Sequence, residues 1–368
     1  MYSFSKRQII CLSLFPVSLL LLWLAKSFPN YTECIFSNFI YKIFAIPIHN
    51  LTALFPFSLA GILYPAAGLI ILYLLIRGIL RIFRTPAANR KARVWQFAVG
   101  WISAAGCFLF LFVITFYCNY YRTPFAEQIG LSASPASVSD LYRLCTDLIA
   151  DANTYRTETQ EDSARSFTLS GSFEDTGREA AQAMSALAET YPVLAGAYHS
   201  PKPVPFSAAL SYTGITGLFS PFTFEANVNT DVPAYSIPAT MCHELSHLRG
   251  FMNEEEANLI AYLACRDSSS ADFRYSGAML ALSYSLSALY EASPSLYWQA
   301  IEALSEPVRR DLNLNNQYWA AREGTLQEAA SAINDTYLKA SNQPDGVKSY
   351  GGIVDLLLAL QNLEKPQP

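Results

Sequence analysis

The sequence has few histidines and no cysteine pair spaced as CxxC, with four histidines and seven scattered cysteines among 368 residues. Neither a zinc ribbon nor a disulfide scaffold is therefore expected. Acidic residues are almost missing from the first third, where Glu33 is the only one before Cys118 against ten Lys and Arg. From Asn119 onward, 29 Asp and Glu face fifteen Lys and Arg without a basic run. This excludes nucleic acid as a partner, because a phosphate backbone requires a Lys/Arg patch.

Long hydrophobic runs are present in the basic first part. The stretches at about 9–24, 57–76 and 94–117 are apolar for long enough to cross a bilayer. We therefore expect a membrane region with three transmembrane helices at residues 1–118 and a separate domain at 119–368. The first run, preceded by Lys6 and Arg7, also fits a cleaved secretory signal.

The loop between the second and third runs is rich in positive charge. It contains Arg77, Arg81, Arg84, Arg90, Lys91 and Arg93. Short loops rich in Lys and Arg stay in the cytoplasm, so the domain at 119–368 is predicted to be extracytoplasmic on a multi-pass protein of the cell membrane. The aromatic loop from about Ser27 to Pro56 is predicted to contact membrane lipid as an interfacial helix or a lid.

The second part is predicted to be mainly helical with a few strands, an α+β domain. Leucine and alanine recur at helical spacing over most of it, whereas 206–238 is rich in Thr, Phe, Gly and Pro. Within that stretch, Phe222 to Asn229 mostly alternates apolar with polar residues and is predicted to be a strand. It is either a plain structural strand or an edge to which a peptide adds by main-chain hydrogen bonds.

The motif that indicates chemistry is TMCHELSHLRGF, which contains His243, Glu244 and His247. Residues four apart lie on one face of a helix, so both imidazoles can reach one ion. Zinc would then need one further protein ligand and a water. Glu244 is the candidate general base for that water. Gly250 is positioned to end the helix.

The third ligand is expected at the start of the next helix, NEEEANLIAYLAC. Glu254 shares a face with Asn258 one turn later, so Glu254 is the preferred ligand and Asn258 is predicted to orient a histidine from the second shell. Glu256 is the alternative ligand; it lies on another face, and the helix crossing angle decides between the two.

Other polar residues are weaker candidates. Glu225, Asn227 and Asn229 are candidate substrate-binding residues, although asparagine in such a loop often serves a turn. A donor that stabilises an oxyanion is also needed, and Tyr350 is the preferred catalytic candidate, with Tyr212 and His199 as alternatives.

Four blocks of the sequence resemble the bacterial membrane-protein family catalogued as domain of unknown function 3810. They are SYTGITGLFSPFTFEANVNTDVP, PATMCHELSHLRGF, EEEANLIAYLAC and DGVKSYGGIVDLLLA. The resemblance covers the three spans and most of the second part, and it implies a zincin-like membrane protein. The spacing from Glu254 to Asn258 is also similar to the ExxAD of gluzincin membrane peptidases, in which the Glu binds zinc.

The expectation from the sequence is a multi-pass helical membrane region followed by a zincin-like zinc metallohydrolase domain. Its substrate would be a peptide or an exported protein, or another molecule such as a cell-wall amide. The alternative is a catalytically silent zincin-fold sensor or binding module that signals through the membrane helices. The intact Glu244 favours the enzyme.

Overall fold

The structure is a computed structural model that describes residues 4–132 and 136–363. It is mostly helical, as the sequence predicts, and it divides into two compact units. The first unit contains the chain up to Ile48, Leu59–Arg122 and Pro221–Thr223. The second contains His49–Ser58, Thr123–Ser220 and the chain from Phe224 onward. The sequence did not predict that His49–Ser58 belongs to the second unit.

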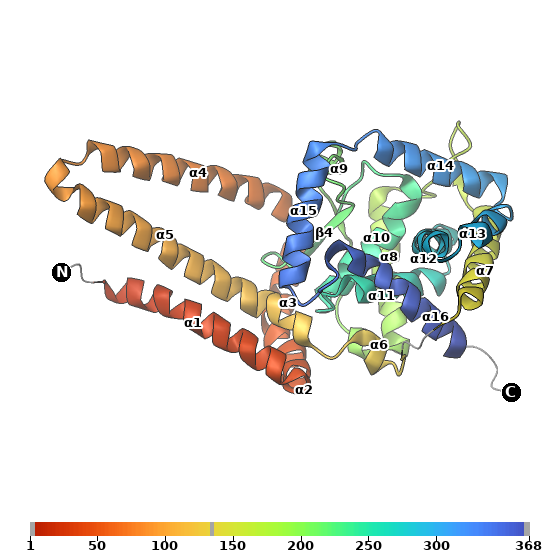
Figure 1. Cartoon of the computed structure of the whole chain (residues 1–368), viewed down its shortest axis with the longest axis horizontal. Coiled ribbons are helices and arrows are strands. Elements are labelled where there is room, and N and C mark those ends of the chain that lie inside the picture. The colour runs from red at the N-terminus through yellow and green to blue at the C-terminus, as the bar shows by residue number, and fades with distance from the viewer. Residues whose placement is uncertain (1–3, 133–135, 364–368) are drawn as a thin grey trace. The chain divides into compact units, whose positions relative to one another are not determined.

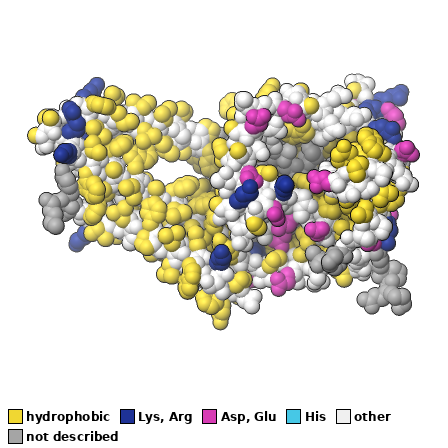
Figure 2. Space-filling view, in the orientation of Figure 1, with side chains coloured by type: hydrophobic (Ala, Val, Ile, Leu, Met, Phe, Trp, Pro, Cys, Tyr) yellow, Lys and Arg dark blue, Asp and Glu magenta, His cyan; other side chains and the backbone are white. Residues whose placement is uncertain are grey.

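Three helices of the first unit are long and apolar enough to cross a membrane, which confirms the three predicted runs. They are α1 (Lys6–Ser27), α4 (Ala60–Arg84) and α5 (Ala87–Thr115). The 25 residues of α4 correspond to about 37 Å of helix, more than the roughly 30 Å hydrocarbon core. Figure 2 shows hydrophobic side chains covering α4 and α5, with Lys and Arg gathered at the end where they join. These helices indicate membrane association.

The segment between α1 and α4 is helical too. It comprises α2 (Pro29–Tyr31), the π-helix η1 (Thr32–Ile40) and α3 (Tyr41–Thr52). Within the first unit, Glu33 of η1 forms a buried ion pair with Arg122, at 2.6 Å between carboxylate and guanidinium. The pair explains how the only acidic residue of the basic part can be buried, because its charge is neutralised.

The second unit packs its helices around α12 (Ala271–Ala292), which Figure 1 shows almost end-on. Most of its residues are buried, and it contacts α7, α10, α11, α13 and α16. The larger helices besides α12 are α7 (Val138–Arg156), α8 (Phe173–Thr190), α10 (Ile237–Leu248), α11 (Glu254–Arg266), α13 (Pro294–Ile301), α14 (Glu306–Ala320), α15 (Thr325–Ala340) and α16 (Ile353–Leu363). The shorter ones are α6 (Phe125–Gln128), η2 (Tyr117–Tyr121, in the first unit), η3 (Pro192–Leu194), α9 (Ser207–Ser211), η4 (Ala234–Ser236) and η5 (Gly346–Gly352).

A three-stranded sheet lies beside α10. Its order is β3 (Lys202–Pro203), β5 (Glu225–Val228), β4 (Gly217–Ser220), with β3 parallel and β4 antiparallel to β5. Strand β5 is therefore central, so the suggestion that it forms an edge was wrong. The two residues of β3 are too short to give a period-two pattern in the sequence. Both β5 and the edge strand β4 contact α10. A separate pair, β1 (Gln160–Glu161) and β2 (Phe167–Thr168), is antiparallel.

Candidate metal centre

Helices α10 and α11 position the candidate site. Pro238 in the first turn starts α10, which ends at Leu248, and Gly250 adopts a φ of +85° where the chain turns back. Helix α11 begins at Glu254, with Asn253 at its N-cap. The short turn brings the first residues of α11 beside the last turns of α10, as the sequence predicts.

Three side-chain atoms converge between these helices. The Nε2 atom of His243 lies 3.1 Å from Oε2 of Glu254 and 3.2 Å from Nε2 of His247. The distance from Nε2 of His247 to Oε2 of Glu254 is 3.7 Å. Ligand atoms about 2.0–2.1 Å from a tetrahedral zinc ion are about 3.3 Å apart, so the three separations fit such an ion. His243, His247 and Glu254 therefore form a group that could hold a metal.

Hydrogen bonds at the Nδ1 atoms of His243 and His247 determine the tautomer of each imidazole. Nδ1 of His247 lies 2.7 Å from the carbonyl oxygen of Phe251, which can only accept, so Nδ1 carries the proton. Nδ1 of His243 lies 2.8 Å from Oδ1 of Asn258. The amide of Asn258 is held in that orientation because its nitrogen donates to the carbonyl oxygen of Tyr350, at 3.1 Å. In the neutral rings both Nε2 atoms are consequently lone pairs, directed at a carboxylate.

Three acceptors facing one another require a cation, either a proton or a metal ion. In the metal-free protein a proton serves. Burial lowers the pKa of His247, but hydrogen bonding and charge attraction from Glu254 outweigh it and raise that pKa to about 9. Burial likewise raises the pKa of Glu254, but the hydrogen bonds from His243 and His247 lower it to about 2. Both shifts describe one ion pair.

Glu244, the residue after His243 in α10, lies beside this group. Its carboxylate is buried and accepts a hydrogen bond from the backbone of Phe219 in the edge strand β4. Its Oε2 has no hydrogen-bond partner among the described residues. Burial raises the pKa of Glu244 to about 7, partly offset by the charges of His243 and His247. The strand approaches so closely that a Cβ atom at Gly217 would collide with this carboxylate.

The other predicted residues near the motif differ in position. The ring of Tyr350 lies almost parallel to that of His243, at 6.4 Å between centroids, and its hydroxyl is bonded to Asn334. Glu256 is buried and bonded to the side chain of Asn253 at 3.4 Å, outside the group of three ligand atoms. Tyr212 is half exposed, near Arg322.

The candidate substrate-binding residues are buried and bonded within the sheet. Glu225 forms an ion pair with Lys202, at 2.6 Å. The amide of Asn227 donates to the carbonyl oxygen of Leu218 at 3.1 Å, and that of Asn229 to the hydroxyl of Ser211 at 2.9 Å. The structure does not bring these three residues to the ligand group, and their role in substrate binding stays a prediction.

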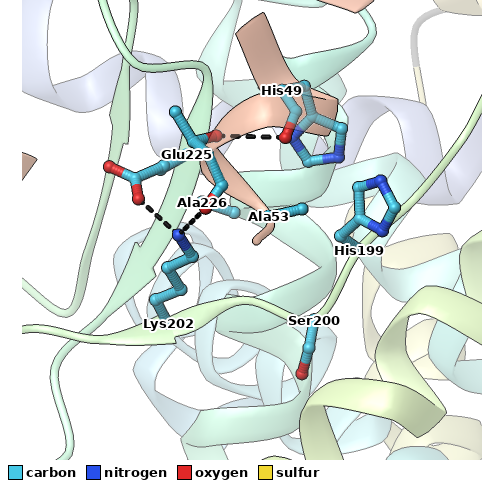
Figure 3. A pocket seen from close by; sticks show the side chains of 8 residues that line it. His49, Ala53, His199, Ser200, Lys202, Glu225 and Ala226 are labelled. Carbon is cyan, nitrogen blue, oxygen red and sulfur yellow. Dashed lines mark hydrogen bonds and ion pairs between the residues drawn. The ribbon is translucent and has the colours of Figure 1, made fainter. Parts of the chain in front are cut away.

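The sequence analysis did not predict a second polar cluster of the second unit, although it named two of its members, His199 and Glu225, as separate candidates. The rings of His49 and His199 lie 4.7 Å apart beside the Lys202–Glu225 ion pair (Figure 3). His49 comes from the end of α3, more than 140 residues away from the others in the chain. The one signal for it was numerical, since His49 and His199 are the two histidines outside the motif.

Comparison with known proteins identifies one family. A family model described as "Protein of unknown function (DUF3810)" matches residues 36–358. The match includes α10, α11 and both histidine pairs. No curated protein and no solved structure matches the chain.

Proposed function

This chain belongs to the DUF3810 family of proteins of unknown function, and from its own residues we propose that it is a membrane-anchored, zincin-like zinc hydrolase that acts as a peptidase. The observation that carries the proposal is the convergence of two imidazole lone pairs and a carboxylate oxygen, at 3.1–3.7 Å, next to a buried carboxylate. His243, His247 and Glu254 would hold the zinc ion. When bound there, zinc supplies a Lewis acid that makes water a nucleophile near neutral pH.

Glu244 is suited to move the proton in this reaction. Its carboxylate is buried beside the two histidines that would hold the metal, so the group can accept a proton from the attacking water and return it to the leaving amine. The bond from the backbone of Phe219 orients the carboxylate, and the atom left without a partner, Oε2, is available to the water. Asn258 keeps His243 in the tautomer that a metal ligand requires.

The edge strand β4 supports a peptide as the substrate class. It runs beside Glu244, and Leu218 within it is 43% exposed. An extended peptide can add to such an edge through main-chain hydrogen bonds, which would bring a peptide bond toward the metal site. A substrate without a backbone would gain nothing from this edge.

The proposed substrates are extracytoplasmic peptides or exported proteins. The basic residues at the adjoining ends of α4 and α5 favour a cytoplasmic position for the turn that joins them, and the crossing by α5 then puts the chain after it outside. A cysteine introduced at the exposed Asp345 should react with a membrane-impermeant reagent in intact cells. Reaction only after lysis would contradict this orientation.

The activity is tested on the full-length protein in detergent, first by metal analysis. We expect one zinc per chain in the parent and in Glu256→Gln, and a loss of zinc affinity of about a hundredfold to a thousandfold in Glu254→Gln. Equal affinity in the two variants would contradict the ligand set. A peptide-library digest follows, in which Glu244→Gln should keep zinc but cleave nothing. Zinc binding without cleavage by the parent would instead favour a silent sensor or binding module.

A further inference from the structure

The ring of His49 is buried, and one of its nitrogens, Nε2, has no hydrogen-bond partner in the described part of the chain. The side chain is 5% exposed, and Nδ1 lies 2.8 Å from the carbonyl oxygen of Phe224. A carbonyl only accepts, so Nδ1 carries the proton and Nε2 is a lone pair. Within residues 4–132 and 136–363, this Nε2 has no hydrogen-bond partner. His49 lines a small pocket together with His199, Lys202 and Glu225 (Figure 3).

The surroundings of this lone pair repel a positive charge. Lys202 and Arg249 act on His49 with the same sign, and His199 would add a further charge if protonated. The carboxylate of Glu225, which lines the same pocket, already neutralises Lys202 at 2.6 Å. A proton that bound to Nε2 would therefore be buried without a counter-ion.

Among the hydrogen bonds of the described residues, three join the segment His49–Ser58 to β3, to the residue before β5 and to the chain just before β3. Besides the bond from His49 to Phe224, the ammonium of Lys202 donates to the carbonyl oxygen of Thr52 at 2.6 Å. The third joins Nε2 of His199 to Oδ1 of Asn50, at 2.9 Å. Two of the three involve an imidazole, so a change of histidine charge acts directly on the attachment of the segment.

The bond to Phe224 also reaches the strands beside the candidate active site. Phe224 has a φ of +51°, which is strained for a phenylalanine, and it directly precedes β5. Strand β5 pairs with β4, whose Phe219 donates to Glu244. Hydrogen bonds therefore connect His49 to Phe224, β5 to β4, and β4 to Glu244, so the position of the segment His49–Ser58 is coupled to that of the β4–β5 hairpin.

We propose that His49 is a pH-dependent switch: when neutral it fixes the segment His49–Ser58 and the β4–β5 hairpin, and when protonated it releases both. This is a regulation of the proposed peptidase and rests on that function, with mild acid on the side of the second unit as the signal. A loosened hairpin would no longer orient Glu244 or present the edge of β4.

The expected size of the effect follows from the difference between the pKa of His49 in the attached segment and its pKa in the released segment. Burial, together with the neighbouring charges, lowers the pKa of His49 from 6.5 to about 4 while it is held. The attachment is therefore complete above pH 6.5 and weakens as the pH falls from there toward 4. Between pH 7.5 and pH 5 the equilibrium for holding the segment should fall about thirtyfold.

Hydrogen exchange measured by mass spectrometry on the metal-free, full-length protein tests this directly. After correction for intrinsic exchange rates, residues 49–58 and 217–229 should lose about thirtyfold protection at pH 5 relative to pH 7.5, whereas α12 should not change. His49→Asn retains a donor for Phe224 but does not titrate, so it should stay protected at both pH values. His49→Phe lacks the donor and should be unprotected at both.

Four further results separate this proposal from the proposed function. Glu244 also titrates in this pH range, so an equal loss of protection in His49→Asn would assign the effect to another group and overturn the switch. NMR titration of the four imidazoles should give His49 a pKa well below 6.5, and a normal value would also overturn it. A second equivalent of zinc that disappears in His49→Asn would make Nε2 a metal ligand instead. If the parent protein binds no zinc at His243, His247 and Glu254, the proposed function is wrong, whereas the pH-dependent protection would still support the switch.

Discussion

The two histidine pairs of the second unit have similar ring separations and opposite electrostatic environments. The rings of His243 and His247 are 4.8 Å apart and those of His49 and His199 are 4.7 Å apart. The first pair faces the carboxylate of Glu254, and the second faces Lys202 and Arg249. Proximity of two imidazoles therefore does not define a metal site. The sign of the neighbouring charge decides whether the lone pairs attract a cation or are kept from one.

The same difference appears in the two pKa values. That of His247 is raised to about 9, chiefly by its carboxylate partner against the effect of burial, and that of His49 is lowered to about 4 by burial. The first pair holds a proton, which a metal ion would replace at the proposed zinc site, whereas the ring of His49 stays neutral. The comparison depends on the charged neighbours, so changing those neighbours is the way to test it.

The largest effect is expected from Lys202→Met. This change leaves the carboxylate of Glu225, whose side chain is 1% exposed, buried without its partner, and should destabilise the second unit by about 3–5 kcal/mol. It also removes a positive charge from His49, so the pKa of His49 should rise. Denaturant unfolding and NMR titration measure the two changes. The double variant Lys202→Met/Glu225→Leu should be much milder, and equal destabilisation in both would refute the buried ion pair.

The second largest effect is a pH dependence of the free energy of unfolding of the metal-free protein. The pKa of His247 is raised, so its ion pair with Glu254 stabilises the fold fully below pH 6.5 and is lost as the pH rises through about 9. The pKa of Glu254 is lowered, so the same contribution is lost as the pH falls from 4.5 toward 2. We expect roughly 3 kcal/mol less stability at pH 10 than at pH 6 in the presence of a chelator. Glu254→Gln should lose the part of this dependence above about pH 7, whereas the part below it includes the titration of Glu244, whose pKa is also raised. An unchanged profile would show that His247 and Glu254 do not form a pair.

The smallest effect concerns Asn258. Replacement by Leu removes the acceptor for Nδ1 of His243, so zinc affinity should fall by about ten- to a hundredfold. Asn258→Asp keeps an acceptor oxygen and should bind zinc at least as well as the parent. Titration against a competing chelator gives both zinc affinities. Identical affinities in the Leu and Asp variants would contradict a role for the hydrogen bond from Asn258 to Nδ1 of His243 in zinc binding.

The local parts of the candidate site were predictable from sequence. The spacing of His243 and His247, the turn at Gly250 and the start of α11 depend on helix periodicity and capping within about twenty residues. The convergence of Glu254 with both histidines follows from that short connection. These features are encoded by neighbours in the chain, where the repeat of the helix limits the possible arrangements.

The non-local parts were not predictable. The cluster around His49 joins a residue at the end of α3 to strands about 150 and 175 residues later, and no periodicity connects them. Nothing in the stretch SPKPVP around Lys202 indicates that this lysine is buried in an ion pair. Strand β5 was found, but its central position depends on β3, which has two residues. The three apolar helices were predictable because length and hydropathy alone define such spans.

Gly217 has a consequence for the divergence of this family. A side chain there would occupy the space of the Glu244 carboxylate, so the two positions are coupled by volume. As long as Glu244 is retained, descendants of this sequence should keep glycine at 217. The methyl group of Thr240 would also lie only 2.8 Å from a Cβ atom at 217, so a lineage is released from that restriction when both Glu244 and Thr240 are replaced by smaller residues, and it can then accumulate alanine or serine in the strand. The residue at 217 would then distinguish homologues that retain the acid from those that have lost it, before any assay is performed.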